Sequence, residues 1–404
     1  MKAKILWSLG MILALASPLF FDHVDHIVKP KGIVTGADQV HAYLHDLKGK
    51  RVGMLVNITS TIGTKSSVDS LRSLGINITR IFGPEHGFRM NASNGAKVDD
   101  EIDPATGIPI ISLYGKKKKP SEADMEAIDV MIFDVQDVGC RFYTKIITLS
   151  EVMEACAENH KKLIILDRPN PNAYVDGPIL EMGLKSGVGK FPIPITHGMT
   201  IGEFAQMING EGWLTNNFKC ELEIIKLQNY NHNRAYTVPI PPSPNLNTQQ
   251  SILLYPSLCL FEGTILSQGR GTDRPFTVLG APALKGKFDF TFKPTAMPGK
   301  SETPLHMGLT CYGLDLSDYD AWGMQRMGKI NIKLMMDMYQ AYPDKEKFFD
   351  YTQNKQMLNI DKLAGTSKFR EQIIAGKSEQ EIRASWEPGL GRYKKMRKKY
   401  LLYP

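Results

Sequence analysis

The sequence predicts an α/β protein with a Rossmann-like, doubly wound parallel sheet and a smaller C-terminal α+β domain. Two observations predict the sheet: short apolar runs alternate with segments of helical spacing through the first half of the chain, and polar residues follow the runs. A third predicts the second domain, because beyond about residue 285 the pattern changes to two short β-like stretches and then amphipathic helices. Strands that alternate with helices form parallel sheets with right-handed crossovers.

The apolar runs expected to form the strands of the sheet are residues 51–56, 77–82, 108–113, 130–135, 163–166 and 222–227. Helices are expected over residues 66–74, 121–128, 144–160 and 201–214, with Ser121 as an N-cap because Asp124 follows three residues later. In the smaller domain we expect strands near residues 288–292 and 306–314, followed by helices. Proline, glycine and charged residues between residues 239 and 276 predict long loops, which in compact domains usually carry function.

A chain of 404 residues fits two domains better than one. We expect a Rossmann-like catalytic domain over residues 24–285 and the smaller domain over residues 286–404. At the N-terminus, Lys2 and Lys4 precede an apolar run that ends in Ala14-Leu15-Ala16, which is the pattern of a cleavable secretory signal. The sequence therefore predicts a signal peptide over residues 1–16 and a mature protein in the periplasm. An uncleaved anchor is the alternative, although the run is short for a bilayer span.

The formal net charge of +7 is concentrated in two basic runs, residues 116–119 and 394–399, which we interpret as solvated faces. No aromatic residues of a recognisable nucleic-acid module interleave with them, so we expect no nucleic-acid partner. The five cysteines are widely spaced without a CxxC pair, which indicates neither a zinc site nor a dense disulfide framework. The first strand is not followed by G-x-G-x-x-G and no Walker loop is present, so no cofactor is predicted.

Polar side chains just past the predicted strands are the main functional signal. They are Asn57, Glu85 with His86, Tyr114, then Asp134, Gln136 and Asp137, and finally Asp167, Arg168 and Asn170. Because the carboxyl ends of parallel strands meet at one edge, we expect these residues to form a polar crevice there. The structural alternative for Asp134 and Asp167 is that they cap helices or pair with Arg141 and Arg168.

Further candidates lie between and beyond the strands. Arg141 and Tyr143 offer a guanidinium and a phenol that suit a carboxylate or sugar hydroxyls. His197 precedes a helix, where a lone histidine is more often a capping group than a ligand. The later loops add Asn245, Glu262, Arg270 and Arg274. Paired carboxylates near arginines and aromatic residues are what hydrolysis of an acidic glycoside requires.

Several motifs, in the same order along the chain, resemble the bacterial exo-β-N-acetylmuramidases. They are Gly83-Pro84-Glu85-His86-Gly87-Phe88, Phe133-Asp134-Val135-Gln136-Asp137-Val138-Gly139, Arg141-Phe142-Tyr143-Thr144, Leu166-Asp167-Arg168-Pro169-Asn170-Pro171, Pro194-Ile195-Thr196-His197-Gly198-Met199-Thr200, Pro241-Pro242-Ser243-Pro244-Asn245 and Gly269-Arg270-Gly271-Thr272-Asp273-Arg274. The resemblance implies a glycoside hydrolase that removes terminal N-acetylmuramic acid from the non-reducing ends of peptidoglycan fragments. It also implies an active site between the two domains.

The resemblance carries over Glu85 as the catalytic candidate, and we expect it to be the general acid. His86, Asp134 and Asp137 complete the catalytic group that the sequence predicts. An arginine, Arg141 or Arg270, is expected to pair with the lactyl carboxylate of the substrate. Two other functions stay open at this point. One is a non-catalytic envelope protein that binds muropeptides, and the other is a metal-dependent amidase or esterase using Glu85, His86, Asp134 and His197.

Overall fold

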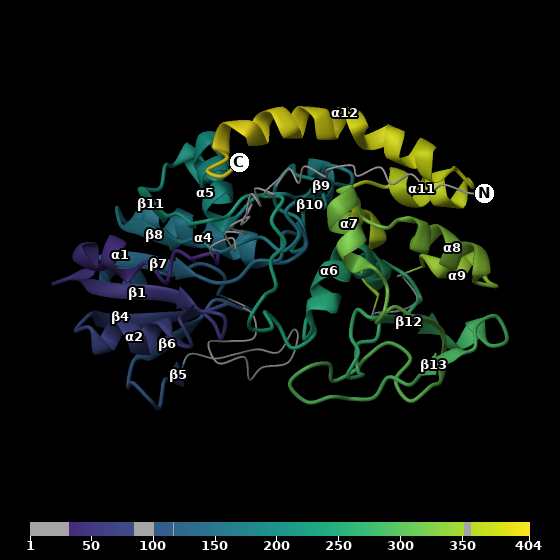
Figure 1. Cartoon of the computed structure of the whole chain (residues 1–404), viewed down its shortest axis with the longest axis horizontal. Helices are drawn as coiled ribbons and strands as arrows, with labels where there is room; N and C mark the ends of the chain where they lie inside the picture. The colour runs from purple at the N-terminus through teal and green to yellow at the C-terminus, as the bar shows by residue number, and fades with distance from the viewer. Residues whose placement is uncertain (1–31, 85–100, 116, 351–356) are drawn as a thin grey trace, which may run out of the picture. The chain divides into compact units, whose positions relative to one another are not determined.

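A computed structural model of the protein describes residues 32–84, 101–115, 117–350 and 357–404 (Figure 1). The predicted signal peptide, residues 1–16, lies outside these ranges, and so do Glu85 and His86. No helix within the described ranges is both long enough and apolar enough to cross a lipid bilayer.

The main sheet contains, within the described residues, seven strands in the order β11-β8-β7-β1-β4-β6-β5. The strands are β1 (Arg51–Val56), β4 (Asn77–Gly83), β5 (Glu101–Ile102), β6 (Pro109–Ser112), β7 (Val130–Asp134), β8 (Lys162–Leu166) and β11 (Leu222–Ile225). All pairings are parallel except that of β5 with β6. Read without β5, the order reverses between β1 and β7, as it does in doubly wound nucleotide-binding folds. The predicted fold class is therefore confirmed.

Alternate residues of the central strands face two different cores. In β1, Val52, Met54 and Val56 belong to the core covered by α1 (Val40–Leu47) and α2 (Ser67–Ser73). Leu55 instead packs in the core under α3 (Glu122–Glu126), α4 (Lys145–Glu158) and α5 (Ile201–Gly210). Because both faces are buried, the strands read as continuous apolar runs, which is why the sequence located them well. Ser121 caps α3 in a reciprocal capping box with Asp124, as predicted.

A third core holds the C-terminal region together. It combines residues of the segment 138–143 with the following helices and a small antiparallel sheet of order β12-β14-β13. The elements are α6 (Gln249–Leu258), β12 (Val278–Ala281), β13 (Phe290–Phe292), β14 (Cys311–Asp315), α7 (Ala321–Met327), α8 (Lys333–Ala341), α9 (Lys345–Phe348), α10 (Ile360–Ala364), α11 (Lys368–Ile374) and α12 (Glu379–Arg397). β12 precedes residue 285 but pairs with β14, so this sheet draws on both sides of the predicted domain boundary.

Short elements complete the described chain. They are the pairs β2 (Thr61–Ile62) with β3 (Lys65–Ser66) and β9 (Val175–Asp176) with β10 (Thr196–His197), and the 3₁₀ turns η1 (Met182–Leu184), η2 (Thr215–Asn217), η3 (Cys259–Gly263), η4 (Pro282–Leu284) and η5 (Lys398–Tyr400).

Helix α12 connects the two regions. It runs from the neighbourhood of α11 back toward α5 (Figure 1). Ile382, Trp386 and Leu390 pack in the C-terminal core, whereas Tyr393 packs in the core of the main sheet. One helix thus buries its two halves in different cores.

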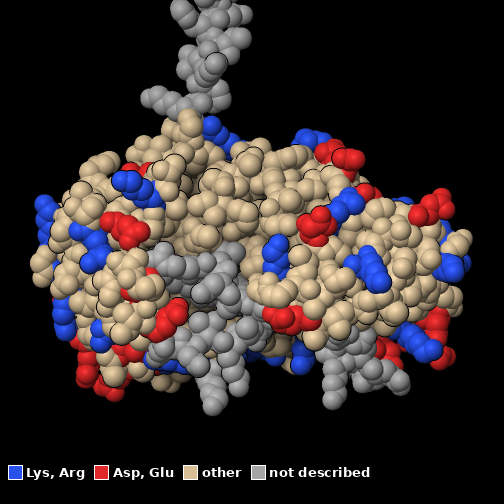
Figure 2. Space-filling view, turned by 90° about the horizontal axis from the view of Figure 1, so that it is seen from below, with Lys and Arg blue, Asp and Glu red and all other residues tan. Residues whose placement is uncertain are grey.

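Charge is distributed without segregation on the face shown in Figure 2. There, described lysine and arginine residues are intermixed with aspartate and glutamate. The described basic residues on that face therefore do not gather into one continuous patch.

Candidate active site

Polar residues at the ends of β1 and β7 bind one another. The side-chain oxygen of Asn57 accepts hydrogen bonds from the backbone N–H and the hydroxyl of Thr59, at 3.0 and 2.6 Å. The Thr59 hydroxyl accepts from the backbone N–H of Gln136 at 3.0 Å, and the Gln136 amide donates to the carbonyl of Pro169 at 2.7 Å. These predicted site residues therefore fasten the strand-end loops to each other.

Asp134 forms a buried ion pair with Arg168. The Nε of Arg168 donates to Oδ1 of Asp134 at 2.7 Å, and its Nη2 donates to the carbonyl of Thr61 at 3.1 Å. Burial raises the pKa of Asp134, although the Arg168 charge opposes this rise. The pair is the arrangement that the structural alternative anticipated for Asp134.

Asp167 anchors the start of α5 and the end of the chain. Its carboxylate accepts hydrogen bonds from the Gly202 N–H (2.9 Å), the Thr200 hydroxyl (2.7 Å) and the Tyr403 hydroxyl (2.6 Å). Burial raises the pKa of Asp167 to about 6 in spite of these donors. Its observed role is thus that of a cap for a helix N-terminus.

Asp137 and His197 form a second buried pair. Asp137 Oδ2 accepts from the Gly139 N–H at 2.7 Å and lies 3.5 Å from Nε2 of His197. The other ring nitrogen of His197 accepts from the Met199 N–H at 3.3 Å, and the Asn170 amide donates to the Met199 carbonyl at 3.0 Å. The turn requires a glycine at position 139, because its φ is +78° and a Cβ there would lie 2.2 Å from Oδ1 of Asn170.

The guanidinium of Arg141 is enclosed in the interior. Its nitrogens donate to the carbonyls of Pro178 (2.9 Å), Ile193 (2.7 Å) and Leu363 (2.7 Å), and burial lowers its pKa to about 9. These bonds connect the segment after β7 to α10 of the C-terminal region. The placement does not favour the predicted contact of Arg141 with a substrate carboxylate.

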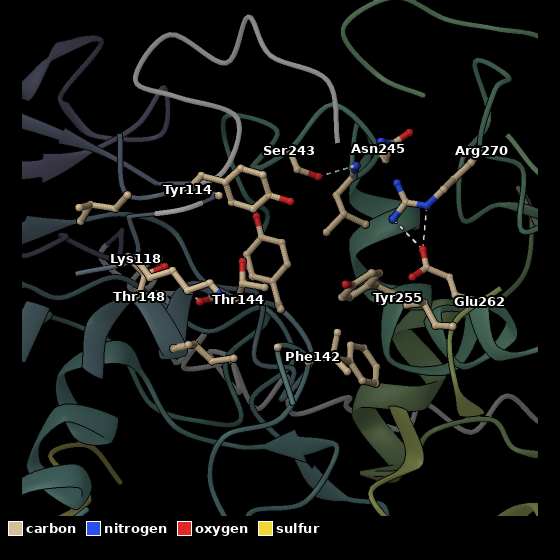
Figure 3. Close-up of a pocket in the computed structure, with 18 of the residues that line it drawn as sticks. Tyr114, Lys118, Phe142, Thr144, Thr148, Ser243, Asn245, Tyr255, Glu262 and Arg270 are labelled. Atoms are coloured by element: carbon tan, nitrogen blue, oxygen red, sulfur yellow. Dashed lines mark hydrogen bonds and ion pairs between the residues drawn. The ribbon is translucent and has the colours of Figure 1, made fainter. Parts of the chain in front are cut away.

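A cavity of about 600 Å³ lies beside the carboxyl end of β6 and the first turns of α4 (Figure 3). Four predicted site residues line it: Tyr143, Asn245, Glu262 and Arg270. Tyr114, which follows β6, lines it as well. The cavity therefore gathers residues from a strand end of the main sheet and from the later loops.

Aromatic side chains form part of the cavity wall. Tyr255 of α6 makes edge-to-face contacts with Phe142, Tyr143 and Phe276, with ring centroids 5.4, 6.0 and 5.0 Å apart. The Tyr143 hydroxyl donates to the carbonyl of Pro242 at 2.9 Å, which fixes the ring against the proline-rich loop. An apolar wall with a few fixed polar groups is typical of a small-ligand site.

Glu262 and Arg270 form an ion pair on one side of the cavity (Figure 3). Nη2 and Nε of Arg270 lie 2.6 and 2.7 Å from Oε1 of Glu262. The guanidinium also lies over the ring of Phe276, 5.0 Å from its centroid. Burial acts to lower the pKa of Arg270, but the charge of Glu262 and the hydrogen bond that it accepts from the guanidinium together raise the pKa above the usual value. The ion pair therefore holds both side chains in one geometry.

The remaining predicted residues lie elsewhere. Arg274 binds Asp315 and Ser317 beside the small sheet and does not line the cavity. Within the described part of the chain, no group of three or more His, Cys, Asp or Glu side chains could hold a metal ion; Glu85 and His86 lie outside this part. All five cysteines lie in the described ranges, where they are buried and free.

Two features of the cavity were missed by the sequence analysis. Thr144, Ile147, Thr148 and Glu151 line it, and their spacing of three and four residues shows that one face of α4 forms a wall. Lys118 also lines it, although it belongs to a run that we interpreted as a solvated face. The helical spacing over residues 144–160 was visible in the sequence, but nothing indicated which face met a cavity.

Comparisons with known proteins cover almost the whole chain. Residues 52–250 match the family model for the N-terminal domain of exo-beta-N-acetylmuramidase NamZ, and residues 253–403 match the model for its C-terminal domain. The chain is 39% identical over 410 aligned positions to the peptidoglycan beta-N-acetylmuramidase NamZ of Bacillus subtilis, covering 96% of this chain and 95% of that protein.

Two crystal structures of DUF1343 family proteins from Bacteroides fragilis share the fold. One is 44% identical with a TM-score of 0.82, the other 29% identical with a TM-score of 0.75, and each alignment covers 92% of this chain and 99% of the other. Both halves of the chain match in order, and the described strand ends carry the motifs of the resemblance. The chain therefore belongs to the exo-beta-N-acetylmuramidase NamZ family of glycoside hydrolases.

Proposed function

We propose that the protein is an exo-acting glycoside hydrolase that releases terminal N-acetylmuramic acid from the non-reducing ends of peptidoglycan fragments. The observation that carries the proposal is the cavity of about 600 Å³, where Glu262, Arg270, Asn245 and Tyr143 meet an aromatic wall. Its volume lies within the range of about 300–1,000 Å³ that is usual for small-ligand sites. The B. subtilis relative named above supports this substrate class.

We propose Glu85 as the general acid that protonates the departing glycosidic oxygen. It follows Gly83, the last residue of β4, by two positions in the sequence, and it lies outside the described residues. Glu85→Gln removes the transferable proton, so turnover of the natural disaccharide should fall by about a hundred- to ten-thousand-fold. A nitrophenyl N-acetylmuramide needs that proton much less, and its bond cleavage should be spared. Equal losses on both substrates would contradict the acid role.

The other predicted catalytic residues differ in whether they line the cavity. Asp134 and Asp137 are buried in networks and do not line the cavity, so we propose that they support the strand-end loops. Glu262 lines the cavity and is held by Arg270, which makes it the better candidate among described acids for a contact with the sugar. His86 follows Glu85 in the sequence and also lies outside the described residues, so its membership of the catalytic group stays a prediction.

The deciding experiment is incubation with a disaccharide that carries N-acetylmuramic acid at its non-reducing end, followed by mass spectrometry of the products. The proposal expects free N-acetylmuramic acid and the second sugar in equal amounts. A protein that only binds muropeptides would leave the disaccharide intact. A metal-dependent amidase or esterase would instead cleave an amide or ester bond and lose that activity with a chelator.

We also propose that the mature protein is periplasmic, because residues 1–16 have the pattern of a cleavable secretory signal. N-terminal sequencing of the protein from the periplasmic fraction should begin near Ser17. Recovery of membrane-bound protein that retains residues 1–16 would overturn this proposal.

A further inference from the structure

Charge is nearly balanced around the cavity, with one exception. Four charged residues line it: Lys118, Glu151, Glu262 and Arg270. Glu262 is paired with Arg270 at 2.6 Å, and Glu151 is paired with Lys190 outside the lining at 2.6 Å. Among the residues that the structure describes, no carboxylate forms an ion pair with Lys118. The described lining of the cavity therefore presents one positive charge, that of Lys118, without a paired carboxylate.

The neighbours of Lys118 in the sequence are occupied differently. Lys117 binds Asp124 at 2.6 Å, and Lys119 binds Glu154 and Glu158 at 3.2 and 2.8 Å. Both of these lysines are thus tied to carboxylates of α3 or α4. Only the middle one of these three described lysines extends into the cavity, on the side of Thr144 and Thr148 and opposite Arg270 (Figure 3).

We propose that Lys118 binds the lactyl carboxylate of N-acetylmuramic acid and so determines specificity for this sugar; the inference rests on the proposed function. N-acetylglucosamine lacks that carboxylate, so an anion site in the cavity distinguishes the two sugars. The two arginines that the sequence suggested, Arg141 and Arg270, are less suitable than Lys118 for binding this carboxylate. Arg141 donates its hydrogen bonds to three buried carbonyls, and the charge of Arg270 is already neutralised by Glu262.

The expected size of the effect follows from the exposure of Lys118, which remains open to solvent. Hydrogen bonds to charged groups change an equilibrium by roughly ten- to a hundredfold, and solvent screening favours the lower end. Lys118→Gln should therefore lower kcat/KM for an N-acetylmuramide by about tenfold. Added salt should lower the wild-type value as well, whereas the variant should be nearly insensitive.

The test uses two aryl N-acetylmuramides, one with the free lactyl carboxylate and one with its methyl ester. In the wild type, esterification should lower kcat/KM about as much as Lys118→Gln does on the acid. The variant should treat acid and ester alike, and Lys118→Arg should restore most of the preference for the acid. Lys117→Gln and Lys119→Gln are the matched controls, and both should keep the wild-type ratio of acid to ester.

The outcomes separate the two proposals. If the wild type releases no N-acetylmuramic acid from any of these substrates, the proposed function fails and this inference fails with it. If the wild type prefers the acid and Lys118→Gln keeps that preference, hydrolysis stands but the assignment to Lys118 is wrong. Unchanged thermal unfolding of Lys118→Gln would establish that any loss arises at the cavity.

Discussion

The carboxyl group of Asp167 should give the protein a stability that depends on pH. Burial raises its pKa from an ordinary 3.8 to about 6. Because the folded protein holds this proton more tightly than the unfolded chain, the stabilisation is fully present below about pH 4 and is lost as the pH rises through about 6. The two pKa values differ by about two units, and one pKa unit corresponds to about 1.4 kcal/mol. The free energy of unfolding should therefore fall by about 3 kcal/mol between low and neutral pH.

Asp167→Asn removes the ionisation but keeps the shape of the side chain. Urea unfolding of wild type and variant should be compared at several values between pH 4 and pH 7.5. The hydrogen bonds that an amide cannot reproduce shift the variant by a constant amount. As the pH rises across this range, the wild type should nevertheless lose about 3 kcal/mol of unfolding free energy relative to the variant.

A second aspartate provides a control of opposite sign. A hydrogen bond from Arg51 lowers the pKa of Asp129 to about 2, so its stabilisation is present above about pH 4 and lost as the pH falls through 2. Asp129→Asn should leave the slope between pH 4 and 7.5 unchanged. If the difference between wild type and Asp167→Asn stays flat over that range, the raised pKa of Asp167 is refuted.

Three further predictions follow from described contacts. Glu262→Gln and Arg270→Ala should each lower kcat/KM, with a loss of transition-state stabilisation of about 1–3 kcal/mol. In steady-state kinetics, the loss in the double variant should be smaller than the sum of the two single losses. Tyr403→Phe removes a hydroxyl bonded to Asp167 and should cost about 1–3 kcal/mol in urea unfolding, without altering KM. Gly139→Ala should destabilise by at least about 2 kcal/mol, because a Cβ would lie 2.2 Å from Asn170; a normal melting temperature would contradict the packing described.

The sequence predicted the main sheet better than the C-terminal region for a physical reason. Strands buried on both faces form unbroken apolar runs, and residues 51–56 were located without error. Helix α6 was not predicted, because it is buried on nearly all sides and so lacks an apolar stripe of helical spacing, and because it contains Pro256, which resembles a loop signal. β12 was missed since it is short and includes Gly280, which approaches the backbone of β14 closely.

The candidate site was predicted in its residue types but only partly in its geometry. The convergence of strand ends on one edge was expected and is observed, yet Asp134, Asp137 and Asp167 are buried there and each binds neighbouring backbone or side-chain groups. Tyr143 and Glu262, two of the predicted site residues, line the cavity. Lys118 could not be singled out, because a run of four lysines gives no sign of which carboxylates its neighbours will meet in space.

The path of α12 has a consequence for how this protein can be assembled. The core of the main sheet includes Tyr393, and the buried carboxylate of Asp167 accepts a hydrogen bond from Tyr403, which lies 236 residues later in the sequence. The first half of the chain therefore lacks part of its own interior until these C-terminal residues have been synthesised. Folding of the sheet should finish only after residue 403 has left the ribosome. For the same reason, the two halves are unsuited to separation or exchange during evolution, and they should be inherited as a pair.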